Sequence, residues 1–216
     1  MTPSQEQRDQ INALVARFEA DTGIQAVAAI TAKADAYPDI PWKAYAMGSA
    51  IGALATALNP YLVAGWSHAG IIALDAMLIL SAGAVLAVLA AFVPPFARLF
   101  LNRVRAQGEA VQYAQSLFLA RELFRTRDRR AVLVVMCCFE RVAVVLTDSG
   151  LTQYASAAAL EQVARTAQAS FARRGLVPAF EAAFGRLGEV LKQTGFTASP
   201  AGHDEIADEL VVEKRT

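Results

Sequence analysis

Asp148 is the residue whose position in the sequence most invites a chemical role. In the run VLVVMCCFERVAVVLTDSG at residues 132–150, it comes directly after the second apolar stretch, which is typical of a strand. An aspartate at a strand end can ligate a metal ion. It can equally terminate the strand and cap the following helix, because its short side chain accepts hydrogen bonds from backbone N–H groups. An aspartate fits both interpretations, so the choice between them depends on whether the neighbouring residues supply further metal ligands.

The neighbours of Asp148 supply few metal ligands. Calcium takes about 6–8 oxygen ligands, and the nearby sequence offers only Thr147, Ser149 and backbone carbonyls. Glu140 and Asp128 are close in sequence, but we expect them at the other end of the strands. The sequence therefore favours Asp148 as a strand terminator and helix N-cap over Asp148 as a metal ligand or functional acid.

No other group of residues predicts catalysis. His68 and His203 are far apart in the chain, and no glycine-rich phosphate loop occurs. Cys137 and Cys138 are adjacent, so on a strand they point to opposite faces and are badly placed to pair. We expect two small buried thiols, in keeping with a reducing compartment. No catalytic residue is predicted.

The chain also contains a segment with the length and composition of a transmembrane region. Hydrophobic residues make up 55% of the 216-residue chain and charged residues 19%, a balance too apolar for a typical soluble domain. Within 41–97, two apolar stretches at about 43–66 and 70–93 are each long enough to cross a hydrocarbon core of roughly 30 Å. A short connection makes them a transmembrane helical hairpin. Aromatic residues expected at the membrane interface are Trp42, Tyr61 and Trp66.

Basic residues predict the orientation of this hairpin. Lys43 precedes the first span and arginines follow the second, whereas the connecting loop has neither lysine nor arginine. The positive-inside rule then places both termini in the cytoplasm, with the hairpin in a bacterial inner membrane. The N-terminus has no signal-peptide profile. Arginines expected to bind lipid or a partner are Arg98, Arg103, Arg105, Arg121 and Arg125.

Two features inside the hairpin allow further hypotheses. Gly48 and Gly52 form a small-residue face for close helix packing, either within the hairpin or between copies of the chain. Asp75 is the single ionisable residue in the spans. It suits an interfacial position near a helix N-terminus, and a channel role would require a ring of several copies.

The remaining sequence predicts one α/β domain interrupted by the hairpin. Residues 1–38 supply a helix, opened by a Ser4-x-x-Gln7 capping box, and a strand at 24–30. This helix and strand cannot bury a hydrophobic core alone, so we expect residues 1–38 to pack with residues 98–196 in one α/β sandwich. Residues 197–216 read as a flexible acidic tail with a short helix near 204–212. The expected elements of 98–196 are a helix at 107–125, strands at 131–138 and 142–147, and two amphipathic helices.

Three segments resemble the TPM domain family, in particular its membrane-bound branch. They are FEADTGIQAVAAITAKADAY (18–37), RRAVLVVMCCFERVAVVLTDSGL (129–151) and FARRGL (171–176). The resemblance implies a small sheet between helices. It also implies calcium binding or phosphatase activity of the kind associated with some soluble members, in which the aspartate matching Asp148 lies near the metal. This chain departs from the soluble pattern, because Arg174-Gly175-Leu176 supplies no second acid.

Taken together, these features predict an integral membrane protein with a cytosolic TPM-like domain. It would act without catalysis, as a scaffold, assembly factor or accessory subunit, and its partners would be the bilayer and a membrane protein or further copies of itself. For this role we expect no cofactor. The alternative is a calcium- or metal-dependent phosphatase-like enzyme with its site near Asp148, for which calcium would be the cofactor. A formal net charge of zero argues against a general nucleic-acid binder.

Overall fold

The computed structural model describes residues 3–58, 68–126, 128–197 and 210–213. They divide into two compact units. The sheet unit contains the residues up to Asp35 and those from Arg103 onward, and the hairpin unit is Ala36–Asn102. The chain thus leaves the sheet unit after Asp35 and returns to it at Arg103.

A four-stranded mixed sheet forms the centre of the sheet unit, in the order β3-β2-β1-β4. β1 pairs in parallel with both β2 and β4, whereas β2 and β3 form an antiparallel hairpin. The prediction of an α/β fold with a small sheet among helices is confirmed. The strands are β1 (Gln25–Thr31), β2 (Ala131–Cys137), β3 (Val142–Thr147) and β4 (Val211–Glu213).

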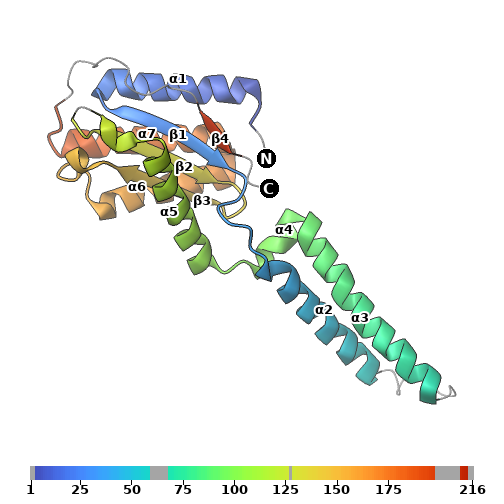
Figure 1. Cartoon of the computed structure of the whole chain (residues 1–216). Coiled ribbons are helices and arrows are strands. Elements are labelled where there is room, and N and C mark those ends of the chain that lie inside the picture. The colour runs from blue at the N-terminus through green and yellow to red at the C-terminus, as the bar shows by residue number, and fades with distance from the viewer. Residues whose placement is uncertain (1–2, 59–67, 127, 198–209, 214–216) are drawn as a thin grey trace. The chain divides into compact units, whose positions relative to one another are not determined.

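Helices cover both faces of this sheet (Figure 1). One face packs against α1 (Gln5–Thr22), α6 (Ala157–Arg174) and α7 (Leu176–Gln193). The other face packs against α5 (Arg103–Ala120) and the short 3₁₀ helix η3 (Leu123–Arg125). A second short 3₁₀ helix, η4 (Ser149–Leu151), follows β3.

Local sequence signals set the ends of α1. The Ser4 side chain accepts from the Gln7 N–H and the Gln7 side chain accepts from the Ser4 N–H, which completes the predicted capping box. Gly23 ends the helix in the left-handed conformation, at φ 69°, and donates to the Glu19 carbonyl. The buried Glu19 carboxylate then accepts from the Ala26 N–H at 2.6 Å, so the end of α1 is joined to the start of β1.

β2 is buried on both faces, as its continuous apolar sequence predicts. Alternate residues serve the two cores: Val134 packs with α6 and α7, and Val135 packs with α5. Cys137 and Cys138 are both buried and free, and they belong to different cores. The expected placement of the two thiols on opposite faces is therefore confirmed.

Of the expected helix at 204–212, residues 204–209 lie outside the described residues, and the described remainder differs from the prediction. Val211–Glu213 form β4, an edge strand that pairs with Ala29–Thr31 of β1. Leu210 and Val211 are buried, and the Leu210 N–H donates to Asn12 Oδ1 at 3.0 Å. Two valines beside β1 gain more from burial against the core than from an isolated helical turn, which is marginal in water.

The hairpin unit consists of α2 (Asp39–Leu58) and α3 (His68–Phe92), followed by α4 (Pro94–Ala97) and the 3₁₀ helix η2 (Arg98–Phe100). α2 and α3 pack closely along a seam of small residues. A Cβ atom on Gly48 would lie 2.5 Å from the Ala82 carbonyl oxygen, and one on Gly52 would lie 2.9 Å from the Ile79 Cα. Glycine is thus required for this helix separation.

The outer faces of α2 and α3 are apolar and exposed. Gly70–Phe92, with a mean hydropathy of 2.4, is the one helical segment among the described residues that is long and apolar enough to cross a membrane. It matches the predicted span 70–93. Only the part of the other predicted span that ends at Leu58 is described. Large apolar side chains exposed on this unit include Trp42, Ile51, Leu54, Ile72, Met77, Val85, Phe92 and Leu99.

Candidate functional site

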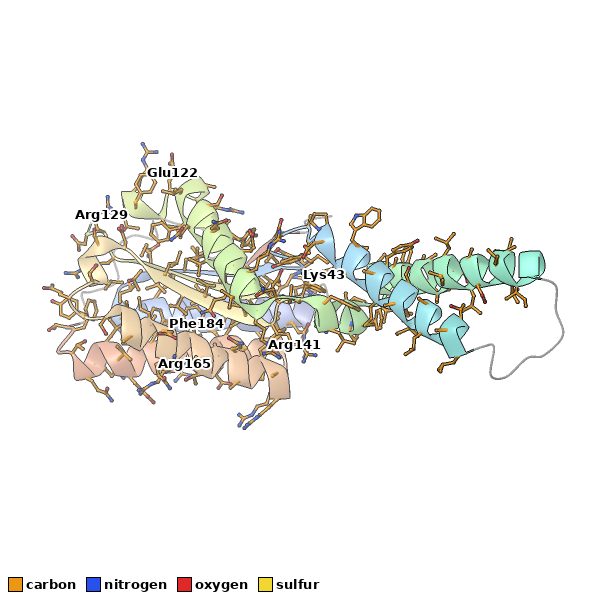
Figure 2. All side chains as sticks on the ribbon, turned by 90° about the horizontal axis from the view of Figure 1, so that it is seen from below. Lys43, Glu122, Arg129, Arg141, Arg165 and Phe184 are labelled. Carbon is orange, nitrogen blue, oxygen red and sulfur yellow. The ribbon has the colours of Figure 1, made fainter. Side chains whose placement is uncertain are left out.

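The strand directions define two ends of the sheet unit. The Asp148 end contains the start of β2 and the end of β3, because Val132 pairs with Thr147. The connection end contains the last residue of β1, Thr31, and the turn between β2 and β3. Figure 2 shows Arg129 and Arg141 at these opposite ends. The two ends are about 20 Å apart, the length of a six- or seven-residue strand.

Asp148 is 5% exposed and has a close cationic partner. Its Oδ1 accepts from the Ser149 N–H at 2.6 Å, and its Oδ2 lies 2.9 Å from Arg129 Nε. The backbone N–H of Asp148 donates to the Ala131 carbonyl, which extends the β2–β3 ladder by one pair. No sequence pattern predicts that Arg129 faces Asp148, because the loop before β2 has no periodicity.

The capping role of Asp148 differs in detail from the prediction. Asp148 caps the short helix η4 through Ser149. The next α-helix, α6, is capped by Ser156, whose hydroxyl accepts from the Ala159 N–H at 3.3 Å. The local sequence Ser156-Ala-Ala-Ala is an ordinary N-cap signal, and the intervening turn separates it from the strand end.

Contrary to our prediction, Asp128 does not lie at the end of the strands opposite Asp148. It lies at the Asp148 end, because it precedes β2 while Asp148 follows β3, and the two strands are antiparallel. Its Oδ2 is 3.9 Å from the Arg130 guanidinium, and its side chain is exposed. Glu140 does lie at the connection end, where it is buried and accepts from the Ala34 N–H at 2.8 Å.

Gly150 holds the loop before β2 against the turn after β3. Its N–H donates to the Arg129 carbonyl at 3.0 Å. A Cβ atom at this position would contact the Asp128 carbonyl oxygen and would lie 2.7 Å from the Arg129 carbonyl oxygen. The glycine therefore permits the close backbone approach that keeps Arg129 beside Asp148.

These residues do not fit a calcium ion. A calcium site needs about 6–8 oxygens, whereas Asp148 Oδ1 already accepts from the Ser149 N–H and Oδ2, which makes no hydrogen bond to the described residues, lies 2.9 Å from Arg129 Nε. A cation on Oδ2 would have to displace the Arg129 guanidinium. Within the described ranges, no three His, Cys, Asp or Glu side chains are grouped so that they could hold a metal ion.

The predicted arginines lie at opposite ends of the sheet unit. Arg103 and Arg105 begin α5 at the connection end, where Arg105 lies 2.8 Å from Asp35. Arg121 and Arg125 follow the last turn of α5, about 27 Å away along an 18-residue helix. Arg125 forms an exposed pair with Glu122 at 2.5 Å. Arg98 belongs to η2 of the hairpin unit.

The predicted hairpin residues are only partly described. Gly48 and Gly52 face α3, so the small-residue seam serves packing inside the hairpin unit. Trp42 is 73% exposed and contacts Tyr45 edge-on. Asp75 is half-buried, at the helical spacing of Ile71 and Ile79. Tyr61 and Trp66 lie outside the described residues.

A pocket of about 390 Å³ lies beside α5 at the connection end. Ala34 and Asp35 form one wall, and Glu109, Gln112 and Tyr113 of α5 form another. Arg105 lies beside both acids, 2.8 Å from Asp35 and 3.5 Å from Glu109. The sequence pattern did not single out this pocket, because its walls come from segments about 70 residues apart.

Comparison with known proteins yields one informative similarity. No family model matches the chain, and no curated protein matches it. A solved structure with a similar fold is the NMR structure of the BA42 protein from the psychrophilic bacterium Bizionia argentinensis. The similarity covers 99% of this chain and 97% of that one, with a TM-score of 0.56 and 10% sequence identity. BA42 is TPM-domain-like.

The chain has a TPM-like fold. At 10% identity the similarity concerns the fold alone, because one fold can carry many unrelated functions. The TPM-like sheet among helices agrees with the fold that the resemblance implied.

Proposed function

We propose that this chain is an integral membrane protein that acts as a scaffold, assembly factor or accessory subunit without catalysis. The α2–α3 hairpin would lie in the bacterial inner membrane, and the TPM-like sheet unit would lie in the cytoplasm. The observation that carries this proposal is the continuous exposed apolar surface of α2 and α3.

That surface is far from what a water-soluble unit presents. Monomeric soluble proteins rarely expose contiguous apolar patches above a few hundred Å². On α3, Ile72 is 68% exposed, Met77 is 69% exposed and Phe92 is 80% exposed. Only 6% of the most apolar window of α3 is buried. The buried core helix of a soluble protein shows the reverse pattern.

The basic residues that flank α2 and α3 support an orientation with both ends of the hairpin in the cytoplasm. Lys43 lies in the first turns of α2, and Arg98 and Arg103 follow α3. Basic residues flanking a hairpin on one side favour the cytoplasmic face for that side. Both connections to the sheet unit then lie in the cytoplasm.

The geometry around Asp148 supports a role without catalysis. The carboxylate is nearly buried and is engaged by Ser149 and Arg129. A general acid or metal ligand at this position would need a second acid or a cluster of ligands. Asp128, the nearest acid along the loop, has an exposed side chain directed to Arg130.

The test is purification of the full chain from native membranes in a mild detergent, followed by size-exclusion chromatography and mass spectrometry. We expect a stoichiometric membrane-protein companion or a defined homo-oligomer. A monomer that co-purifies with nothing and turns over a phosphoester would contradict the proposal. If that turnover were lost in the Asp148→Asn variant, the phosphatase-like alternative would replace it.

A further inference from the structure

We infer that the connection end of the sheet unit carries a second membrane contact, a basic surface that binds anionic lipid headgroups. Its residues are Arg103, Arg141, Arg173 and Arg174, here named the connection-end basic surface. The inference rests on the proposed membrane location and goes beyond it by assigning lipid recognition to residues far apart in the sequence.

The topology brings these four arginines to one end of the sheet. Arg141 ends the β2–β3 turn, whose Cys138 and Phe139 N–H groups donate to the Thr31 and Ala32 carbonyls at the end of β1. Arg103 begins α5, next to the Arg105–Asp35 ion pair. Both points at which the chain leaves and re-enters the sheet unit lie at this same end.

The direction of α6 adds Arg173 and Arg174. α6 begins soon after η4, at the Asp148 end, and packs along β3 through Val163 and Ala167. Its 18 residues span about 27 Å, which returns its last turn to the connection end. Figure 2 shows Arg165, midway along α6, between the two ends marked by Arg129 and Arg141.

These arginines are exposed and lack the ion pairs seen at the other end. Arg103, Arg141, Arg173 and Arg174 are all exposed, and none has an acidic partner within ion-pair distance among the described residues. Three acids at this end have described partners: Asp35 and Glu109 lie beside Arg105, and Glu140 accepts from the Ala34 N–H.

The Asp148 end shows the opposite arrangement. There Arg125, Arg129 and Arg130 lie near Glu122, Asp148 and Asp128, respectively. Arg121 at the Asp148 end is also exposed without a described ion pair, but the four other such arginines lie at the end from which the chain passes to the hairpin unit. A guanidinium binds phosphate through two parallel hydrogen bonds, so anionic phospholipid headgroups are the complementary ligand.

The geometry of the turn favours this use of Arg141. Its backbone is left-handed at φ 57°, in a turn fixed by the buried Glu140 carboxylate and by Lys33, which lies 4.8 Å from the Phe139 ring centroid. A rigid turn presents its charge without the entropy cost of ordering a loop. We therefore expect Arg141 to make the most localised lipid contact of the four.

The test is hydrogen exchange of the full chain in nanodiscs of phosphatidylcholine alone or with 30% phosphatidylglycerol. Each arginine near an anionic surface strengthens association about fivefold. We expect exchange in the β2–β3 turn and the last turn of α6 to be slower by about tenfold or more with phosphatidylglycerol. The protection should disappear at high salt, because the contact is electrostatic.

A matched pair of variants tests which arginines cause the lipid-dependent protection. The triple variant Arg141→Gln, Arg173→Gln and Arg174→Gln should lose the lipid-dependent protection. The control variant Arg121→Gln, Arg125→Gln and Arg165→Gln removes the same charge from other exposed positions and should keep it. Even if the triple variant does not fold, comparing the two lipids in the wild-type chain tests whether the connection-end basic surface binds anionic lipid.

Three outcomes would overturn the inference. One is equal exchange of the wild-type chain in the two nanodiscs, and another is equal loss of protection in the control variant. The third is the same protection from a soluble polyphosphate in phosphatidylcholine nanodiscs, which would assign the surface to a soluble anion. Failure of the chain to insert into nanodiscs at all would instead contradict the proposed membrane location, on which the inference rests.

Discussion

At the scale of single residues, the buried polar groups of the sheet unit act as structural ties. Asp148 joins the turn after β3 to Arg129, and Glu140 joins the β2–β3 turn to Ala34 at the other end of the sheet. Each carboxylate holds a backbone segment or a cation in place. The observed contacts of Asp148 thus serve to hold the geometry of these loops.

Cys137 provides a pH-dependent prediction. Burial raises the pKa of its thiol, with smaller contributions from the nearby Glu140 and Cys138. An exposed thiol has a pKa of about 8.5, so above that pH unfolding releases a proton that the folded chain retains. We expect the free energy of unfolding to fall as pH rises through 9 and 10, and the Cys137→Ala variant to show a smaller fall in denaturant titrations.

The same burial predicts low thiol reactivity. At pH 8 the native chain should resist alkylation of Cys137 and Cys138 by iodoacetamide, because the thiolate is the nucleophile and neither side chain is open to solvent. Both should react within minutes in denaturant. Rapid modification of the folded chain, followed by mass spectrometry, would show that the strand end is open.

Gly150 offers a sharper test of the Asp148 end. A Gly150→Ala substitution should destabilise the chain by about 1–3 kcal/mol, because the new Cβ would press on the Asp128 and Arg129 carbonyls. Gly108→Ala is the matched control. Gly108 lies within α5 with open space around it, so alanine there should stabilise by about 0.5–1 kcal/mol. Equal effects of the two substitutions in urea unfolding would contradict the close approach at Gly150.

At the scale of elements, the seam between α2 and α3 holds the hairpin unit together, and the edge strand β4 completes the sheet of the sheet unit. The α2–α3 seam depends on glycine, which allows the helix backbones to approach each other. β4 adds a fourth strand beside β1 and covers part of the core with Leu210 and Val211. Both elements act through packing between segments distant in the sequence.

The hairpin seam predicts a difference between two leucine substitutions. Gly48→Leu should force α2 and α3 apart and lower the thermal stability of the hairpin in detergent, because its side chain would meet the α3 backbone. Ala53→Leu adds comparable bulk to an exposed position of α2 and should have little effect. A loss of dimer with an intact hairpin in Gly48→Leu would instead assign the seam to contacts between copies.

Sequence patterns predicted the elements with strong local signals. The capping box at Ser4, the apolar run of β2 and the amphipathic spacing of α7 each correspond to an observed element. β4 had no such signal, since two valines in an acidic context gain stability only from a distant strand. The position of Asp128 could have been deduced, because an antiparallel hairpin brings the residues before and after it to the same end.

The candidate site was less predictable than the fold. Whether Asp148 faces a second acid or a cation depends on the path of the loop before β2. That path is set by Gly150, by the left-handed backbone of Arg129 at φ 54° and by the Thr126 hydroxyl, which accepts from the Arg130 N–H. Such contacts combine positions about 20 residues apart and leave no periodic signal in a single sequence.

At the scale of the whole molecule, two connections at one end of the sheet link the TPM-like sheet unit to the apolar hairpin unit. We propose that the hairpin crosses the membrane with both connections in the cytoplasm. The exposed apolar surface and the flanking basic residues carry this claim, and the scaffold role and the connection-end basic surface both depend on it.

The most direct test is labelling of single introduced cysteines in intact bacterial cells with a membrane-impermeant maleimide. The positions are Ser67→Cys, between the two predicted spans, and Gln107→Cys, on the exposed side of α5. We expect Ser67→Cys to be labelled in intact cells and Gln107→Cys to be labelled only after lysis. Labelling of both positions only after lysis, with the chain in the soluble fraction, would contradict this proposal.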